Sequence, residues 1–193
     1  MARATLVILL AMLGLAGGPV GAEPIEPAPT AGAPDAEALL SRLWQVTALA
    51  PTRPVLMRVV GGLGPNAVSA PGGITLSREF LRRTRRLRDG ERILARTLAH
   101  ELAHIALGHT HAASPRAELD AEALGIRYFE LAGLDCRWWV AYVASAAETA
   151  GRHGWPPLRE VIAHDRQACA RARADLGRAA DPAPARTDGI VNR

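Results

Sequence analysis

The sequence predicts an α+β fold, with a small sheet early in the chain and a helical body after it. Two observations support this fold class. Alternating, β-branched segments with turn residues between them occur between residues 55 and 77, and apolar residues at helical spacing dominate the chain after them. With 193 residues, 49% of them apolar, the chain has the length of one domain with a buried core, predicted over residues 35–178.

The first 34 residues are predicted to precede that domain. Residues 1–22 begin with the basic Arg3, continue with the apolar stretch Leu6–Leu15 and end on small residues, which is the pattern of a cleavable signal peptide. The apolar stretch is shorter than the ~20 residues that a membrane-spanning helix needs. Residues 23–34 are rich in Pro and Ala, as is typical of a disordered lead-in. We therefore expect an exported protein, periplasmic or secreted, whose contact with a membrane would be peripheral and not integral.

The elements of the domain follow in order along the chain. A first helix is expected over residues 35–50, where Leu39 and Leu43 share an apolar stripe and Pro51 ends it. Val55–Val60 alternates and predicts a strand, and Pro71-Gly72-Gly73 predicts the turn of a hairpin, so that a small antiparallel sheet forms. Helices are expected over about 77–88, 91–108, 115–132, 136–150 and 157–177, before a disordered tail over 179–193.

The helix predicted over 77–88 concentrates positive charge. Its arginines are Arg82, Arg83, Arg85, Arg86 and Arg88. The favoured interpretation is a solvated helix face, and the alternative is a site for acidic lipid or an acidic partner. The residues expected to turn inward are Phe80, Leu81, Thr84 and Leu87. The net charge of the whole chain is only +4, which is too small to indicate a nucleic-acid partner.

Two cysteines, Cys136 and Cys169, fall in separate predicted helices. An exported protein meets an oxidising compartment, where the two thiols can form a disulfide. The alternative is two buried, small hydrophobic residues. The sequence leaves both interpretations open.

The segment Thr97–His109 reads TLAHELAHIALGH, and it places polar residues in an apolar helix. His100 and His104 are four residues apart, so their imidazoles lie on one helix face and converge on one point. Glu101 can reach a water at that point. This spacing is typical of a zinc site, in which the metal lowers the pKa of water towards ~7 and a carboxylate moves the proton to the leaving amine. The apolar flanks favour this interpretation over a pair of hydrogen-bonded helix histidines.

A third ligand is expected soon after this motif. Gly108 can end the helix in the left-handed conformation. Ser114 is a good N-cap and Pro115 a good first residue for the next helix. Glu118 then falls in the first turn of that helix, and the short connector brings it close enough to complete the site.

Other side chains near Glu118 have alternative roles. His109 and His111 lie in the connector and compete with Glu118 for the third ligand position. Glu122, one turn after Glu118, shares its face and can orient a ligating imidazole. Asp120 points elsewhere on an ideal helix and is expected to be solvated.

Three blocks of the sequence, taken in order, resemble one protein family. They read PNAVSAPGGITLSREFL, ILARTLAHELAHIALGH and ELDAEALGIRYFELAGLD. They are similar to the hairpin, the His-Glu helix with a trailing His and the Glu-x-x-x-Asp helix of the HtpX, BepA and CAAX-endopeptidase family of zinc metallopeptidases. The resemblance implies a mostly helical, zincin-like domain of the gluzincin type. It also implies zinc as the cofactor, His100, His104 and Glu118 as its ligands, and Glu101 as the catalytic base.

The same resemblance implies a place for the substrate. The hairpin over 66–73 would lie beside the active site and hold a peptide in extended form through its edge strand. The substrate-binding residues implied in this way are Asn66, Ala67, Ser69, Gly72 and Gly73.

The sequence departs from the family pattern in several places. Glu122 stands where the family has Asp, and the connector before Glu118 is shorter than is usual. In RHGWPPLREVI, Gly154 and Trp155 interrupt the family's Thr-His-Pro-Pro segment, and Val161 replaces an Arg. His153 is a further candidate catalytic residue, which would stabilise the oxyanion or gate the site, and the alternative is a histidine in a surface loop. No transmembrane helix follows the catalytic block, so we expect a compact, soluble and exported member.

The predicted function is therefore that of an exported zinc metalloendopeptidase. It would hydrolyse peptide bonds of protein or peptide substrates, with protein quality control in the cell envelope as one setting. The alternative is a non-proteolytic, zinc-containing module that binds client proteins. The short connector before Glu118 and the replacement of the family's Arg by Val161 favour this alternative. The intact Glu101 argues against that alternative, because a purely structural zinc site needs no base.

Overall fold

The computed structural model describes residues 35–47, 49, 55–63, 66–109, 114–147 and 157–180. The predicted signal peptide, the lead-in and the residues from 181 onwards lie outside the described residues. Among the helices that are described, none has the length and apolar character that a membrane span requires.

The described part is mostly helical and carries a small sheet, as the α+β prediction states. In chain order the elements are α1 (Ala36–Gln45), β1 (Leu56–Val60), β2 (Ala67–Ala70), β3 (Gly73–Ser77), α2 (Arg78–Thr84), α3 (Gly90–Ala106), α4 (Pro115–Leu131), α5 (Cys136–Ala147) and α6 (Leu158–Ala180). The expected first helix was too long. It ends at Gln45, because the backbone N–H groups of Val46 and Thr47 bond to carbonyls three residues earlier and tighten the chain into a turn.

The sheet has the strand order β1-β3-β2. The hairpin prediction is confirmed: β2 and β3 are antiparallel, and Gly72 in the turn between them has a φ of 84°, which favours glycine. The prediction of a purely antiparallel sheet is wrong, because β1 pairs with β3 in parallel. The strand β2 therefore forms one edge of a mixed sheet.

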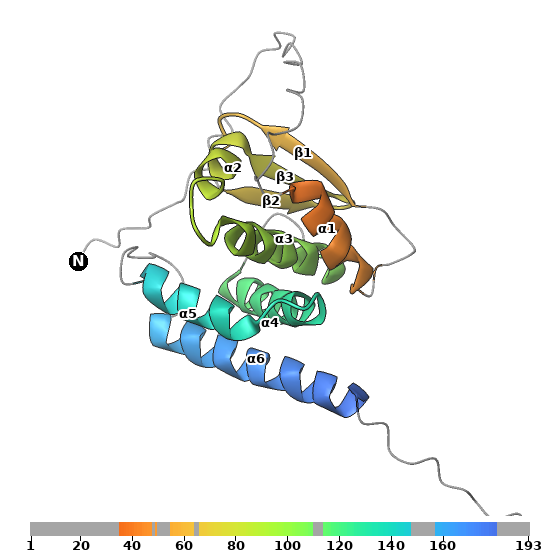
Figure 1. Cartoon of the computed structure of the whole chain (residues 1–193), viewed down its shortest axis with the longest axis vertical. Helices are drawn as coiled ribbons and strands as arrows, with labels where there is room; N and C mark the ends of the chain where they lie inside the picture. Colours follow the sequence, from red (N-terminus) through yellow and green to blue (C-terminus); the bar gives the residue numbers. More distant parts are fainter. Residues whose placement is uncertain are drawn as a thin grey trace, which may run out of the picture. The chain divides into compact units, whose positions relative to one another are not determined.

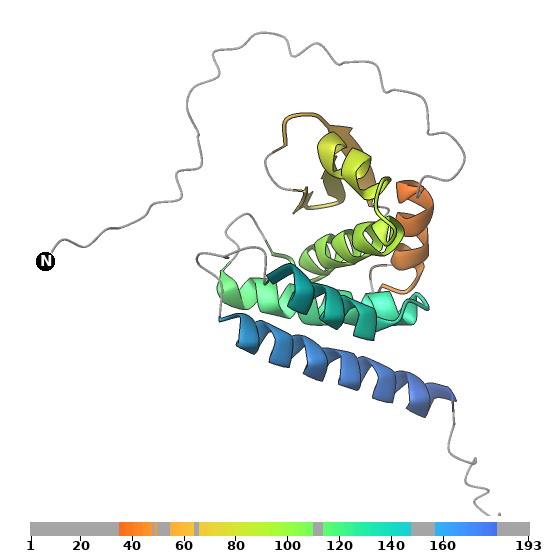
Figure 2. The ribbon, with the colours of Figure 1, turned by 60° about the vertical axis from the view of Figure 1, so that its left-hand side comes forward.

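Helix α3 is the central element of the domain. It contacts α1, α2, β2 and β3 on one side and α4 on another (Figure 1). Helix α4 in turn packs on α6, and α5 and α6 lie side by side (Figure 2). The α3 residues that are fully buried by these neighbours are Leu94, Ala95, Leu98, Ala99, Leu102 and Ala103. Burial by several neighbours explains why apolar residues occupy more than one side of this helix.

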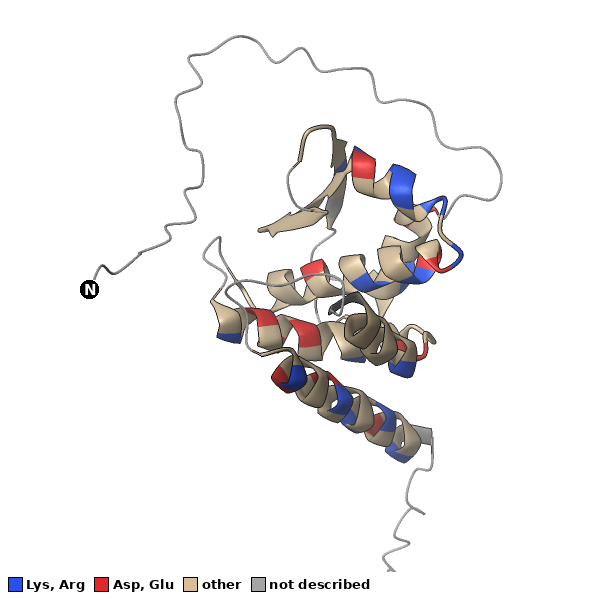
Figure 3. Cartoon of the chain, turned by 90° about the vertical axis from the view of Figure 1, so that its left-hand side faces the viewer, with Lys and Arg blue, Asp and Glu red and all other residues tan. Residues whose placement is uncertain are grey.

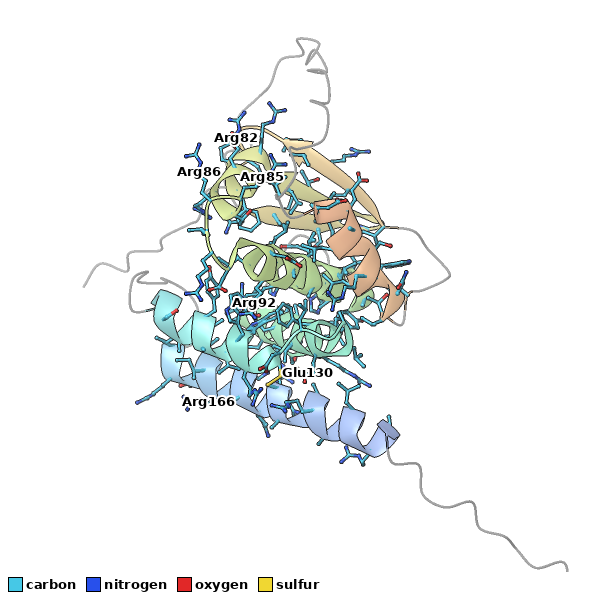
Figure 4. The ribbon with its side chains drawn as sticks, viewed as in Figure 1. Arg82, Arg85, Arg86, Arg92, Glu130 and Arg166 are labelled. Atoms are coloured by element: carbon cyan, nitrogen blue, oxygen red, sulfur yellow. A yellow bond between two sulfur atoms is a disulfide. The ribbon has the colours of Figure 1, made fainter. Side chains whose placement is uncertain are left out.

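The arginine-rich segment forms a shorter helix than expected. Phe80, Leu81 and Thr84 are buried as predicted, but Leu87 is 46% exposed and the prediction for this residue is wrong. The reason is that α2 ends at Thr84, and the N–H of Leu87 bonds to the Thr84 carbonyl in a tight turn, so the inward stripe does not continue. The five arginines are exposed, and Figure 4 labels three of them: Arg82 in the last turn of α2, and Arg85 and Arg86 just after it.

The two cysteines form a disulfide that joins the start of α5 to the middle of α6. It appears as the yellow bond near Glu130 in Figure 4. Of the two interpretations that the sequence left open, the structure supports the disulfide.

Replacing both cysteines by serine (Cys136→Ser with Cys169→Ser) is expected to lower the free energy of unfolding by about 2–4 kcal/mol. The crosslink closes a loop with a sequence separation of 33, and its loss restores conformational freedom to the unfolded chain. Urea unfolding of the parent, with and without a reducing agent, and of the double variant measures the effect. The reduced parent should resemble the double variant. A parent whose midpoint does not respond to reductant would contradict the prediction.

Candidate metal centre

Two imidazoles face each other on α3. His100 and His104 are one helical turn apart, and their Nε2 atoms lie 3.0 Å from each other. The His104 side chain is buried and that of His100 is 15% exposed. The helix is held in place by its apolar neighbours, so both rings are presented from a rigid support.

Glu118 approaches both imidazoles from α4. Helix α3 ends at Ala106, Gly108 follows it with a φ of 67°, and α4 begins with Ser114 accepting a hydrogen bond from the Ala117 N–H. As a result, Oε2 of Glu118 lies 3.2 Å from Nε2 of His100 and 3.5 Å from Nε2 of His104. The structure thus brings together the three residues that the sequence predicted as ligands, with their ligand atoms all within 4.8 Å of one another.

The residues that converge here fit a zinc ion. Tetrahedral zinc with ligand atoms at ~2.0–2.1 Å requires those atoms to be about 3.3–3.4 Å apart. The three measured separations are 3.0, 3.2 and 3.5 Å, which agree with that requirement to a few tenths of an ångström. Two nitrogen ligands and one oxygen ligand are also the chemistry that zinc prefers, and they leave one tetrahedral position for solvent or substrate.

The pKa values at the site reflect the close contact of opposite charges. Burial lowers the pKa of His100, but its hydrogen bond to Glu118 and its close contact with the charged Glu122 outweigh this effect and raise the pKa to about 9. Burial raises the pKa of Glu118, but hydrogen bonds from His100 and His104 outweigh it and lower the pKa to about 2. In the metal-free protein at neutral pH, Glu118 is therefore ionised. The imidazole of His100 is positively charged and lies between the carboxylates of Glu118 and Glu122.

Glu101 directly follows the candidate ligand His100 in α3 and is largely buried, with 9% of its surface exposed. Within the part of the chain that the structure describes, its carboxylate makes no hydrogen bond or ion pair. A buried carboxylate without such a partner in the described part of the chain, directly after a candidate metal ligand, is available to accept a proton from a water molecule.

Glu122 is fully buried behind His100. Its Oε2 lies 3.7 Å from Nδ1 of His100, and its Oε1 accepts a hydrogen bond from Nη2 of Arg96. Helices α3 and α4 pack against each other, and Figure 3 shows acidic residues in red and basic residues in blue along the ribbons of the helices. Sequence reasoning missed Arg96. The signal that could have found it is the spacing Arg-x3-His-x3-His on α3 opposite Glu-x3-Glu on α4.

Gly125 allows α4 to pass close to α3 beside the ligands. A Cβ atom at position 125 would lie 3.2 Å from both the carbonyl oxygen of Ala99 and the Cα of His100, and 3.0 Å from the ring of Trp139. These distances are shorter than ordinary van der Waals contacts. The absence of a side chain at Gly125 therefore permits the close approach of α4 to α3 beside His100.

The other candidate residues lie in different places. Nδ1 of His109 is 3.0 Å from Nδ1 of His104, the nitrogen that does not face the cluster, so His109 lies behind a candidate ligand and outside the cluster. Asp120 accepts a hydrogen bond from the exposed Arg116 and is turned away from the cluster. His111 and His153 lie outside the described residues, and their predicted roles stay predictions.

The hairpin residues implied as substrate-binding lie along β2 and its ends. Asn66 precedes β2, where its Oδ1 accepts a hydrogen bond from Arg83. Ala67 is buried and Ser69 half-buried, while Gly72 and Gly73 form the turn and the start of β3. Because β2 contacts α3, the hairpin lies against the helix that carries both imidazoles.

No protein-family model, curated protein or solved structure matches this chain. Membership of the metallopeptidase family therefore stays a prediction from the three sequence blocks.

Proposed function

We propose that this protein is a zinc-dependent metalloendopeptidase, an exported and compact member of the zincin-like family that its sequence resembles. One observation carries the proposal. The ligand atoms of His100, His104 and Glu118 lie within 4.8 Å of one another, and the buried Glu101 directly follows His100 on the same helix. This combination of a metal site with a base favours hydrolysis over a purely structural role.

Each residue of the site has a separate role in the proposed hydrolysis of peptide bonds. Zinc, when bound to His100, His104 and Glu118, supplies a Lewis acid that lowers the pKa of water and polarises a peptide carbonyl. Glu101 accepts the proton of the attacking water and delivers it to the leaving nitrogen. His153 is proposed to stabilise the oxyanion from the segment before α6.

The proposed substrates are protein chains in extended form. An edge strand has backbone N–H and C=O groups available for pairing, and β2 is an edge strand next to the metal-binding helix. Pairing through the backbone would make cleavage tolerant of side-chain sequence, which suits the removal of unfolded proteins. The disulfide supports an exported location, because such crosslinks persist in oxidising compartments.

Metal analysis and a protease assay on the purified mature protein test this function together. We expect about one zinc per chain and cleavage of denatured casein, which stops after removal of zinc by a chelator and returns when zinc is added back. A protein that holds zinc and binds casein but releases no new peptides would be the client-binding module instead. That result would overturn the proposed function.

The affinity for zinc is expected to fall about tenfold when the pH is lowered from about 8 to about 7. The pKa of His100 in the metal-free protein is raised from 6.5 to about 9, so zinc must displace a proton at both pH values. The raised pKa of His100 also increases the free energy of unfolding of the metal-free protein. This contribution is fully present at pH values below the usual imidazole pKa of 6.5, and it is lost as the pH rises through about 9. Competition with a chromophoric chelator, corrected for its own protonation, measures the affinity. Equal affinities at both pH values would contradict the prediction.

A further inference from the structure

Arg96 is a largely buried cation one turn before His100, with 14% of its side chain exposed. A buried guanidinium is unfavourable unless its charge is compensated. Its Nη2 donates to Oε1 of Glu122, and its guanidinium carbon lies 4.8 Å from the ring centre of Trp139 and 5.9 Å from that of Tyr142. The group is therefore held by a carboxylate from α4 and two aromatic rings from α5.

The contacts between α3 and α4 alternate in charge along the interface. Arg96, His100 and His104 follow one another at four-residue intervals on α3, and Glu122 and Glu118 do so on α4. Glu118 lies between the two imidazoles, and Glu122 lies between Arg96 and Nδ1 of His100. One carboxylate thus connects the guanidinium to the outer nitrogen of a predicted metal ligand.

We propose that Arg96 is a positioning residue for the metal centre, and that it acts through Glu122 on His100. A glutamate side chain has one more rotatable bond than an aspartate, so a second anchor is needed to hold its carboxylate behind an imidazole. The planar guanidinium supplies that anchor, and the rings of Trp139 and Tyr142 fix the plane of the guanidinium. Oε2 of Glu122 lies 3.7 Å from Nδ1 of His100, beyond hydrogen-bond distance, and its negative charge favours a proton on that nitrogen, which leaves the lone pair of Nε2 for the metal. The inference rests on the proposed zinc site but not on the identity of the substrate.

The test replaces Arg96 by Met, which keeps much of the volume and removes the charge. We expect zinc affinity to fall about 10–100-fold and the visible absorption bands of the cobalt-substituted protein to shift. Glu122→Gln should cause a similar loss, and the double variant should lose little more than either single variant, because the two residues act in series. The matched control is Arg92→Met, one turn earlier on α3. Arg92 also lies over a ring, that of Trp138 at 5.8 Å, but it is exposed and pairs with Asp89.

A metal-free measurement separates this inference from the proposed function. The nitrogen-15 resonances of the His100 imidazole should move in Arg96→Met and stay unchanged in Arg92→Met, whether or not the parent binds zinc. If Arg96→Met does not fold, Arg96→Lys, which keeps the charge but loses the planar fork, is measured in its place. Unchanged His100 resonances, or parental zinc affinity and cobalt spectrum, would overturn the inference even if the variant is less stable. A parent that binds no zinc would overturn the proposed function instead.

Discussion

Replacing Glu101 by Gln is expected to abolish cleavage of denatured casein while leaving the zinc content and the fold intact. The amide has nearly the same shape as the carboxylate but cannot accept the proton of the attacking water. General-base catalysis of this kind contributes about 10²–10⁴-fold, so the rate should fall by at least that factor. No structural loss is expected, because Glu101 makes no hydrogen bond or ion pair within the described residues.

The control for this variant is Glu91→Gln, the same chemical change in the first turn of the same helix, where the side chain is exposed. It should cleave casein at the parental rate. Zinc analysis and urea unfolding, performed on both variants, establish that the site and the fold are intact. If Glu101→Gln digests casein as fast as the parent, then Glu101 is not the base and the proposed mechanism is wrong.

Replacing Glu118 by Ala is expected to remove about one zinc per chain and, with it, the peptidase activity. The change deletes one of three ligand atoms and leaves only the two imidazoles, which cannot hold the metal with comparable affinity. It also removes the carboxylate that lies 3.2 Å from His100, so the raised pKa of that imidazole should fall towards its usual range. Metal analysis of the purified variant measures the first effect.

Asp120→Ala is the matched control, because Asp120 lies two residues away on the same helix and pairs only with the exposed Arg116 among the described residues. It should keep the parental zinc content. A Glu118→Ala variant that still holds one zinc per chain would exclude Glu118 as a ligand. In that case a histidine of the connector would be the third ligand. If that histidine is His109, its imidazole would have to leave its contact with Nδ1 of His104.

Much of the local structure could be predicted because it depends on neighbouring residues. The four-residue spacing of His100 and His104 matches one helical turn, and Pro71-Gly72 supplies the backbone conformations that a tight turn needs. Ser114 and Pro115 fixed the start of α4 for the same reason, since a cap satisfies N–H groups within its own turn. These features require no knowledge of distant parts of the chain.

Other features could not be read from the local pattern of residues. Leu87 fits the apolar stripe of a helix, but α2 ends one turn earlier and leaves it exposed. The parallel pairing of β1 with β3 could not be read from either strand, because alternation of side chains is the same in both orientations. The pairing of Cys136 with Cys169 likewise depends on how α5 packs against α6.

The sequence alone determined the helix that carries two imidazoles and a carboxylate, and the cap that starts the next helix, because periodicity and capping act over a few residues. Only the tertiary structure decided that Glu118 reaches those imidazoles and that Arg96 reaches Glu122. Both contacts depend on the close packing of α3 and α4, which the missing side chain of Gly125 permits.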